Sequence, residues 1–285
     1  MRAPLAEAYD VGTARPNRRQ ASERSALEAY ESFAGIYNEF NHRNDYETWI
    51  GSVLLPKLLD YGLKEPGAAL DVGCGTGRAF LPLLRRGWEV CGCDISPAMV
   101  AIAREHFGQQ VSLSVADMRS LPALGSFNLV LIMNDAVNHL LTDRELQQTA
   151  TGVARNLLPG GLLLFDCNTT ALFSKLFGAG ERHVVERGGR RWTWQGLGEG
   201  DRSPATFRAR ISGDSIDSIV ITERHFSQPE VEAALEATGL ECRAVLGQHE
   251  ADGGVVLDEQ PDDKRDDKFI YIASRRAGVG RSAAG

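Results

Sequence analysis

The chain has 285 residues, of which 43% are hydrophobic, and a formal net charge of −7. This length predicts one large domain or one domain with a lid, and the apolar fraction is sufficient for a core. The negative charge argues against nucleic acid as the main partner, because phosphate contacts need clustered Lys and Arg.

The sequence also bears on the compartment. No apolar run is long enough to span a bilayer, and no apolar stretch follows the N-terminal arginines, so we expect neither a membrane segment nor a secretory signal. Five scattered cysteines favour reduced thiols in a cytoplasmic protein. We expect no metal site, because the pair Cys91 and Cys93 lacks further ligands at close spacing.

The chain begins with a polar segment, residues 1–24, that we interpret as a flexible tail. Apolar residues then recur at helical spacing over residues 27–40 and again over residues 46–58. Gly67 ends this pattern.

An alternation of short apolar strands and amphipathic helices follows. Residues 78–86 are expected to be helical, Ser96 with Pro97 is a favourable helix start, and Thr142 with Glu145 forms a capping-box pattern. Alternating strands and helices predict a parallel sheet covered on both faces. The expected strands are residues 68–72, 88–93, 111–115, 127–133 and 162–167.

The pattern changes in the second half of the chain. Residues 181–224 are typical of antiparallel strands, with a hairpin turn at Gly188 and Gly189. A boxed helix then begins at Ser227, followed by strands at 240–246 and 269–273. The acidic residues 250–268 between those strands are expected to be a solvated loop.

A glycine-rich turn, residues 71–77 (Asp-Val-Gly-Cys-Gly-Thr-Gly), lies where the first strand meets the next helix. Ligands of open α/β sheets bind at such strand ends. In the dinucleotide fingerprint G-x-G-x-x-G, the third glycine would stand at Arg78 rather than Gly77. Asp71 suits the ammonium of a methionine moiety, directly or through water, better than a pyrophosphate.

Two further strands end in acidic residues. Asp94 ends the second strand and is placed to accept both hydroxyls of a ribose. The third strand leads to Asp117 and Met118, which suit the exocyclic amine and the ring face of an adenine.

These motifs resemble those of class I S-adenosylmethionine-dependent methyltransferases, and residues 158–162 (Leu-Pro-Gly-Gly-Leu) resemble the start of their fifth strand. Residues 134–141 and 267–271 resemble the fourth motif and final strand of small-molecule methyltransferases, of the type found in natural-product biosynthesis. So does the N-terminal pattern Tyr-x-x-Phe-Ala-x-x-Tyr, which is Tyr30, Phe33, Ala34 and Tyr37.

The resemblance implies an α/β, Rossmann-like fold: a seven-stranded, mostly parallel sheet with the last strand antiparallel, helices on both faces, an N-terminal helical segment and a small antiparallel β lid. It divides the chain into tail 1–24, N-terminal helices and cofactor-binding core 25–174, lid 175–224, C-terminal core 225–276 and tail 277–285.

The implied reaction is methyl transfer from S-adenosyl-L-methionine to N or O, or C, of a small molecule such as an amino sugar. For the cofactor we assign the following residues: Tyr37, Asp71, Gly73, Cys74, Gly75, Thr76, Gly77, Asp94, Ile95, Met99, Asp117, Met118 and Asn134. His139 is the candidate catalytic base, with a helix cap or packing under the cofactor as the alternative. Asp135, His139, His225 and Trp194 are candidates for acceptor binding, with a structural role as the alternative for each and the favoured one for His225 and Trp194.

Other functions stay open at this stage. They are an RNA or protein methyltransferase, a nicotinamide oxidoreductase, which Arg78 disfavours, and a non-catalytic binding module. We expect no membrane and no nucleic-acid partner, and a homodimer is one option for the oligomeric state.

Overall fold

The computed structural model describes residues 18–200, 205–251 and 254–276. The expected tails 1–24 and 277–285 lie outside these ranges except for residues 18–24, and there the expectation is wrong. Helix α1 (Arg18–Phe40) already begins inside the segment. Arg, Gln, Ala and Glu have favourable helix propensity, so a helix can start there without an apolar period.

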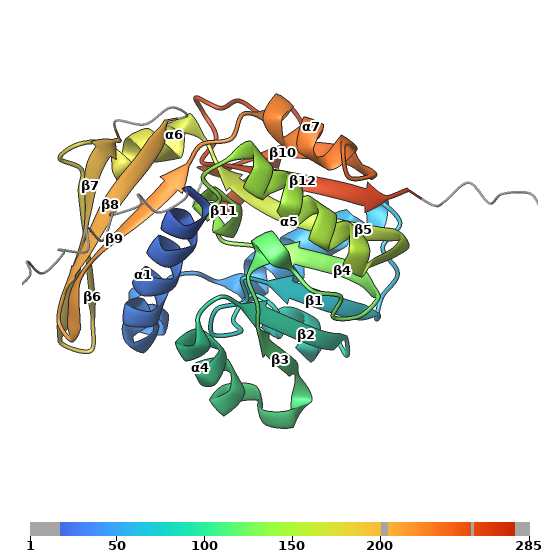
Figure 1. Cartoon of the computed structure of the whole chain (residues 1–285), viewed down its shortest axis with the longest axis horizontal. Coiled ribbons are helices and arrows are strands. Elements are labelled where there is room, and N and C mark those ends of the chain that lie inside the picture. The colour runs from blue at the N-terminus through green and yellow to red at the C-terminus, as the bar shows by residue number, and fades with distance from the viewer. Residues whose placement is uncertain (1–17, 201–204, 252–253, 277–285) are drawn as a thin grey trace, which may run out of the picture.

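The main sheet has eight strands in the order β11-β10-β12-β5-β4-β1-β2-β3 (Figure 1). Strands β1 to β5 and β10 run parallel to one another, whereas β12 and β11 run antiparallel to them. This confirms the Rossmann-like sheet, and β11 adds an eighth strand at the edge. The strands are β1 (Ala68–Val72), β2 (Glu89–Asp94), β3 (Ser112–Val115), β4 (Phe127–Ile132), β5 (Leu157–Asn168), β10 (Leu240–Ala251), β11 (Gly254–Asp258) and β12 (Lys268–Arg275).

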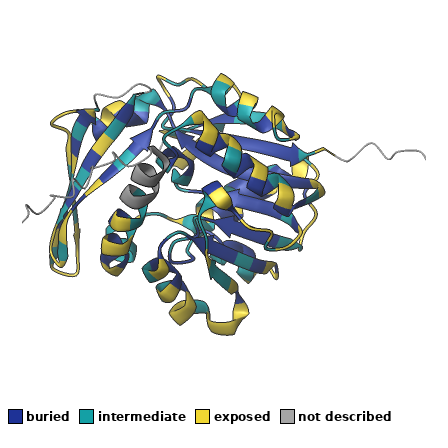
Figure 2. Cartoon of the chain, in the orientation of Figure 1, coloured by how far each residue is buried: buried dark blue, intermediate teal, exposed yellow. Residues whose placement is uncertain are grey.

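Helices cover both faces of this sheet, and most of its strands are buried (Figure 2). Successive residues of a strand point to opposite faces, so Leu70 joins the hydrophobic core under α5 and α7 while Ala69 joins the core under η1, α2 and α3. The helical segments are η1 (Glu47–Leu54), α2 (Leu55–Asp60), α3 (Leu81–Arg85), α4 (Pro97–Phe107), η2 (Gly108–Gln110), η3 (Met118–Ser120), η4 (Ala136–His139), α5 (Asp143–Asn156), α6 (Thr170–Leu172), η5 (Phe173–Phe177) and α7 (Gln228–Glu236).

A separate antiparallel sheet contains β6 (Arg182–Arg187), β7 (Arg190–Glu199), β8 (Thr206–Gly213) and β9 (Ile216–Arg224). It matches the antiparallel strands expected over 181–224, including the turn at Gly188 and Gly189. Helix α1 lies between this sheet and the main body (Figure 1). Its side chains Phe33 and Ile36 pack with Trp192 and Ile221 in one apolar cluster.

Of three local expectations about helix starts, one is confirmed and two differ in detail. The helix expected from residue 78 begins only at Leu81, and residues 78–80 instead continue the turn. Ser227 and Glu230 form the expected capping box. Thr142 caps α5, but the carboxylate of Glu145 accepts from the amide of Leu141 at 2.7 Å, so this second capping box is not completed as expected.

The acidic segment 250–268 is not simply a solvated loop. It contains β11, and Asp266 within it is buried. The carboxylate of Asp266 accepts hydrogen bonds from Arg265, His249 and the amide of Asp262. Charge composition alone gave no sign that these donors would gather around it. No helix in the described part of the chain is long and apolar enough to cross a membrane.

Candidate functional site

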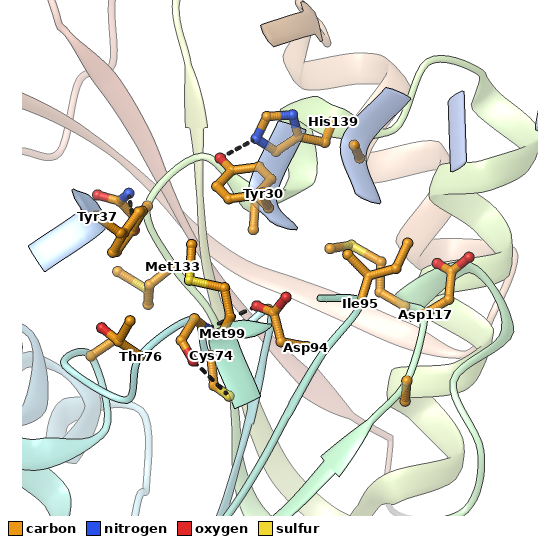
Figure 3. A pocket seen from close by; sticks show the side chains of 18 of the residues that line it. Tyr30, Tyr37, Cys74, Thr76, Asp94, Ile95, Met99, Asp117, Met133 and His139 are labelled. Carbon is orange, nitrogen blue, oxygen red and sulfur yellow. Dashed lines mark hydrogen bonds between the residues drawn. The ribbon is translucent and has the colours of Figure 1, made fainter. Parts of the chain in front are cut away.

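A pocket lies at the carboxyl ends of the parallel strands, between the glycine turn and α1 (Figure 3). This is the edge of an open α/β sheet where ligands bind. Most residues assigned from sequence to the cofactor line this one pocket, together with the candidate base. They are Tyr37, Gly73, Cys74, Gly75, Thr76, Asp94, Ile95, Met99, Asp117, Met118, Asn134 and His139.

The glycine turn has the backbone conformation that its sequence requires. Gly73 and Gly75 have φ of 75° and 52°, which L residues rarely adopt. A Cβ at Gly77, which does not line the pocket, would meet the rings of Phe107 and Phe80. Gly77 therefore serves the packing beneath the turn.

Arg78 has a structural role that explains why it stands where a dinucleotide fold has glycine. Its guanidinium donates to the carbonyl oxygens of Asn41 and Asn44, both at 2.7 Å, and lies over the ring of Tyr46. It thereby ties the glycine turn to the segment that follows α1.

Asp71 lies beneath the pocket rather than in its lining. Its side chain is buried, and neither carboxylate oxygen has a hydrogen-bond partner among the described residues. Burial, together with the nearby Asp94, raises the pKa of Asp71 to about 8. A buried carboxylate without partners is costly, so this site fits a cationic group such as the ammonium of a methionine moiety.

Asp94 is held in a fixed orientation at the end of β2. One oxygen accepts from the amide of Gly75 at 2.8 Å and the other from the amide of Ser96 at 2.9 Å. Burial raises the pKa of Asp94, while these amides oppose the rise. Asp117, after β3, accepts from the amide of Arg119 and from its guanidinium, both at 2.9 Å.

The loop after β4 contains a charged cluster behind the pocket. Asn134 and Asp135 have positive φ, which Asn and Asp tolerate better than most residues. Asn134 donates to the hydroxyl of Tyr37 at 3.3 Å. Lys268 bridges Asp135 at 2.8 Å and Asp166 at 2.5 Å. The position of Asp135 is thus set by contacts with β5 and β12.

His139 is fixed by two hydrogen bonds. One joins its Nε2 to the hydroxyl of Tyr30 at 2.8 Å (Figure 3), and the other joins the ring to the backbone of Thr222 in β9. When the proton of the neutral ring lies on the nitrogen that faces Thr222, Nε2 accepts from Tyr30. Burial lowers the pKa of His139, which keeps the ring neutral near pH 7.

Glu223, also in β9, completes the cluster. Its carboxylate lies near the carboxylate of Asp135 and the ring of His139. One carboxylate oxygen of each acid and one ring nitrogen of His139 lie within 4.8 Å of one another. Burial raises the pKa of Glu223 well above its ordinary value, and the charge of Asp135 adds to this. Asn168 donates to Glu223 at 2.9 Å.

Two residues expected to bind the acceptor lie away from this pocket. Trp194 packs edge-on against Phe177 and donates to the carbonyl of Leu176 at 2.8 Å. His225 bonds to Asp263 at 2.9 Å. Neither is among the residues that line the pocket, so their placement favours the structural alternative.

Several residues that line the pocket had no site role assigned from the sequence: Tyr30, Tyr46, Met133 and Arg119. Tyr30 stands seven residues before Tyr37, which is about two helical turns, so helical periodicity could have placed both on one face. Glu223 offered no such signal, because it reaches the site through the second sheet.

Comparison with known proteins bears on this pocket. Residues 69–161, which run from β1 into β5, match the methyltransferase domain family. Over this segment the chain is similar to methyltransferase domains. This confirms the resemblance that the glycine turn and the following acidic residues indicated.

Among curated relatives, a Geobacillus sp. (strain WCH70) protein with a methyltransferase name is 37% identical over 151 residues, which is 52% of this chain and 61% of that protein. The chain thus spans about three fifths of the first curated relatives it matches. A dTDP-3-amino-3,4,6-trideoxy-alpha-D-glucopyranose N,N-dimethyltransferase of Streptomyces venezuelae is 29% identical, over 64% of this chain and 79% of that enzyme.

Solved structures share the fold over most of the chain. An S-adenosylmethionine-dependent methyltransferase from Clostridium acetobutylicum superposes with a TM-score of 0.67 at 19% identity, covering 87% of this chain and 99% of that one. This agreement supports the fold beyond the 69–161 segment.

Proposed function

We propose that the protein transfers a methyl group from S-adenosylmethionine to an amine of a small molecule. The methyltransferase domain and the pocket lining support the donor. The observation that carries the choice of an amine is the cluster of buried acids behind the pocket, next to His139.

The residues of the pocket divide among the parts of the donor. Asp71 would face the methionine ammonium, Asp94 would accept from the ribose hydroxyls, and Asp117 with Met118 would hold the adenine. Tyr37 and Asn134 would close the methionine end. When bound, S-adenosylmethionine supplies a methyl group on an electrophilic sulfonium, so the protein's main task is to align the acceptor and exclude water.

The charge cluster favours a cationic or proton-bearing acceptor. Asp135 and Asp166 share the single ammonium of Lys268, the carboxyl group of Glu223 lies beside Asp135 and His139, and all three acids are at least partly buried. Buried charges need partners. The ammonium form of an amine would supply the missing positive charge next to His139.

His139 with Tyr30 can accept the proton that the amine must lose. With the ring proton on the nitrogen that faces Thr222, the Nε2 lone pair of neutral His139 accepts from the hydroxyl of Tyr30, which lines the pocket. Tyr30 can therefore take a proton from the acceptor while passing its own to His139. General-base assistance of this kind contributes roughly 10²–10⁴-fold to a rate.

More specifically, we propose that the acceptor amine belongs to an amino sugar, which the name of the Streptomyces venezuelae relative supports. The purified protein would be given methyl-labelled S-adenosylmethionine with glucosamine, with simple alkylamines and with phenols. We expect transfer to amines and little to phenols. Faster transfer to phenols would contradict the assignment of an amine.

The role of His139 is tested in the same assay. His139→Ala should lower kcat by about 100-fold while calorimetry finds the affinity for S-adenosylhomocysteine unchanged. The matched control is His106→Ala on the exposed side of α4, which should leave both values unaltered. An unchanged kcat in His139→Ala would remove it as the base.

A further inference from the structure

A second cleft lies beside the cofactor pocket. It is about 440 Å³ in volume and opens between residues 43–49 and the hairpin formed by β10 and β11. That volume is in the range of small-molecule sites. Tyr46, Met133 and Asn134 line both the cleft and the pocket, so the two adjoin at these residues.

The walls of this cleft combine aromatic faces with acids. Tyr46 and Trp49 are half-buried on one side, and the exposed carboxylates of Asp45 and Glu250 lie among the lining residues. An aromatic face packs against the C–H face of a saturated ring, and carboxylates accept from its hydroxyl or amine groups. This is the chemistry of a site for a hydroxylated ring.

Two residues that line the cleft also have side-chain oxygen atoms that accept no hydrogen bond. Asp166 Oδ1 and Gln248 Oε1 are buried and have no hydrogen-bond partner in the described part of the chain. Buried polar atoms are nearly always paired, so each unpaired one needs an explanation. A ligand rich in hydrogen-bond donors would supply partners after small side-chain adjustments.

The charges of the cleft disfavour a phosphate. Of its two basic residues, Lys268 is already bound by Asp135 and Asp166, which leaves Arg43. A phosphate would face the three acids Asp45, Asp166 and Glu250. The cleft therefore suits a neutral or cationic ligand.

We propose that this cleft binds the part of the acceptor beyond the methylated amine, namely a second hydroxyl- or amine-bearing ring without phosphate. The inference rests on the proposed function, since it takes the pocket to hold the methyl donor. It also assigns a role to β11, which lies outside the seven strands expected for the fold and supplies Gly254 and Val255 to the wall.

Calorimetry on the complex with S-adenosylhomocysteine tests the cleft independently of turnover. The probes are neamine, which has two amine-bearing rings, glucosamine, which has one, and UDP-glucosamine, which adds a diphosphate. We expect neamine to bind at least tenfold more tightly than glucosamine, and UDP-glucosamine to bind no more tightly than glucosamine.

Variants locate the effect. Trp49→Ala should remove most of the advantage of neamine and leave the affinities for glucosamine and S-adenosylhomocysteine unchanged. Glu250→Gln, at an exposed position, should weaken neamine several-fold without risk to folding. Its matched control is Glu241→Gln, at the other end of β10 and equally exposed.

The outcomes separate the two proposals. No preference for neamine, a preference that survives both cleft variants, or tighter binding of UDP-glucosamine that Trp49→Ala abolishes would each overturn the cleft assignment. Methylation of glucosamine in such a case would leave the proposed function standing. Failure of the unmodified protein to bind S-adenosylhomocysteine would instead contradict the proposed function.

Discussion

Asp71 is the residue whose environment most clearly calls for a ligand. Its unpaired, buried carboxylate has a pKa of about 8, so without the cofactor it is mostly protonated at pH 7. A cationic ammonium beside it favours the carboxylate form and lowers that pKa. Binding at pH 7 should therefore release a proton from Asp71, and affinity should rise as the pH approaches 8.

The measurement is calorimetry of S-adenosylhomocysteine binding at pH 7 in two buffers of different ionisation enthalpy, which reports the number of protons exchanged. We expect release of about one proton. Asp71→Asn should abolish the release and weaken binding. Equal proton release by the variant would show that another group titrates.

The residues that the sequence assigned to the donor lie together around one pocket, whereas Trp194 and His225, assigned to the acceptor, lie away from it. Asp94 and Asp117 could be placed because each follows a strand whose end is fixed by the parallel sheet. His139 was a candidate by position, but its partners Tyr30 and Thr222 come from segments far away in the chain. Such contacts depend on how α1 and the second sheet dock, which residue patterns do not encode.

Among the elements, α1 is joined directly to the part of the site around Asp94. Glu31 accepts from the hydroxyl of Ser96 at 2.6 Å and from the amide of Ala98 at 2.9 Å, and so caps the start of α4. Ser96 in turn donates its amide to Asp94. This chain of bonds fixes α1 over the proposed ribose position.

Glu31→Ala should therefore weaken S-adenosylhomocysteine binding several-fold, because α1 loses its bond to α4 while the pocket residues remain. The control is Glu28→Ala, one turn earlier on the same helix and exposed. Dissociation constants from calorimetry compare the two. Equal affinities in both variants would mean that α1 is held by its apolar contacts alone.

The elements themselves were largely predictable, because their caps, turns and periodic apolar residues are local signals. Two elements lacked such local signals. Strand β11 was missed because it lies at the start of the acidic segment 250–268, and it is held by pairing with β10 rather than by a buried apolar face. The first turns of α1 were missed because they lack an apolar period.

The arrangement of the whole molecule makes α1 the shared boundary between its two sheets. Its residues Phe33 and Ile36 pack in the cluster of the small sheet, while Tyr30 and Tyr37 line the pocket above the main sheet. Occupancy of the pocket should accordingly be transmitted to the small sheet through α1 and β9. No residue of the outer hairpin, formed by β6 and β7, lines the pocket.

Hydrogen exchange measures this coupling. Saturation with S-adenosylhomocysteine should slow amide exchange in α1, in the glycine turn and in β9, and leave the exposed turn at Gly188 unchanged. Ligand at 100 times its dissociation constant should also raise the free energy of unfolding by about 2.7 kcal/mol. Asp94→Ala should lose both effects, because without the ribose acceptor the ligand no longer binds the folded state selectively. Protection confined to the main sheet, with α1 and β9 exchanging as before, would mean that the two sheets respond independently.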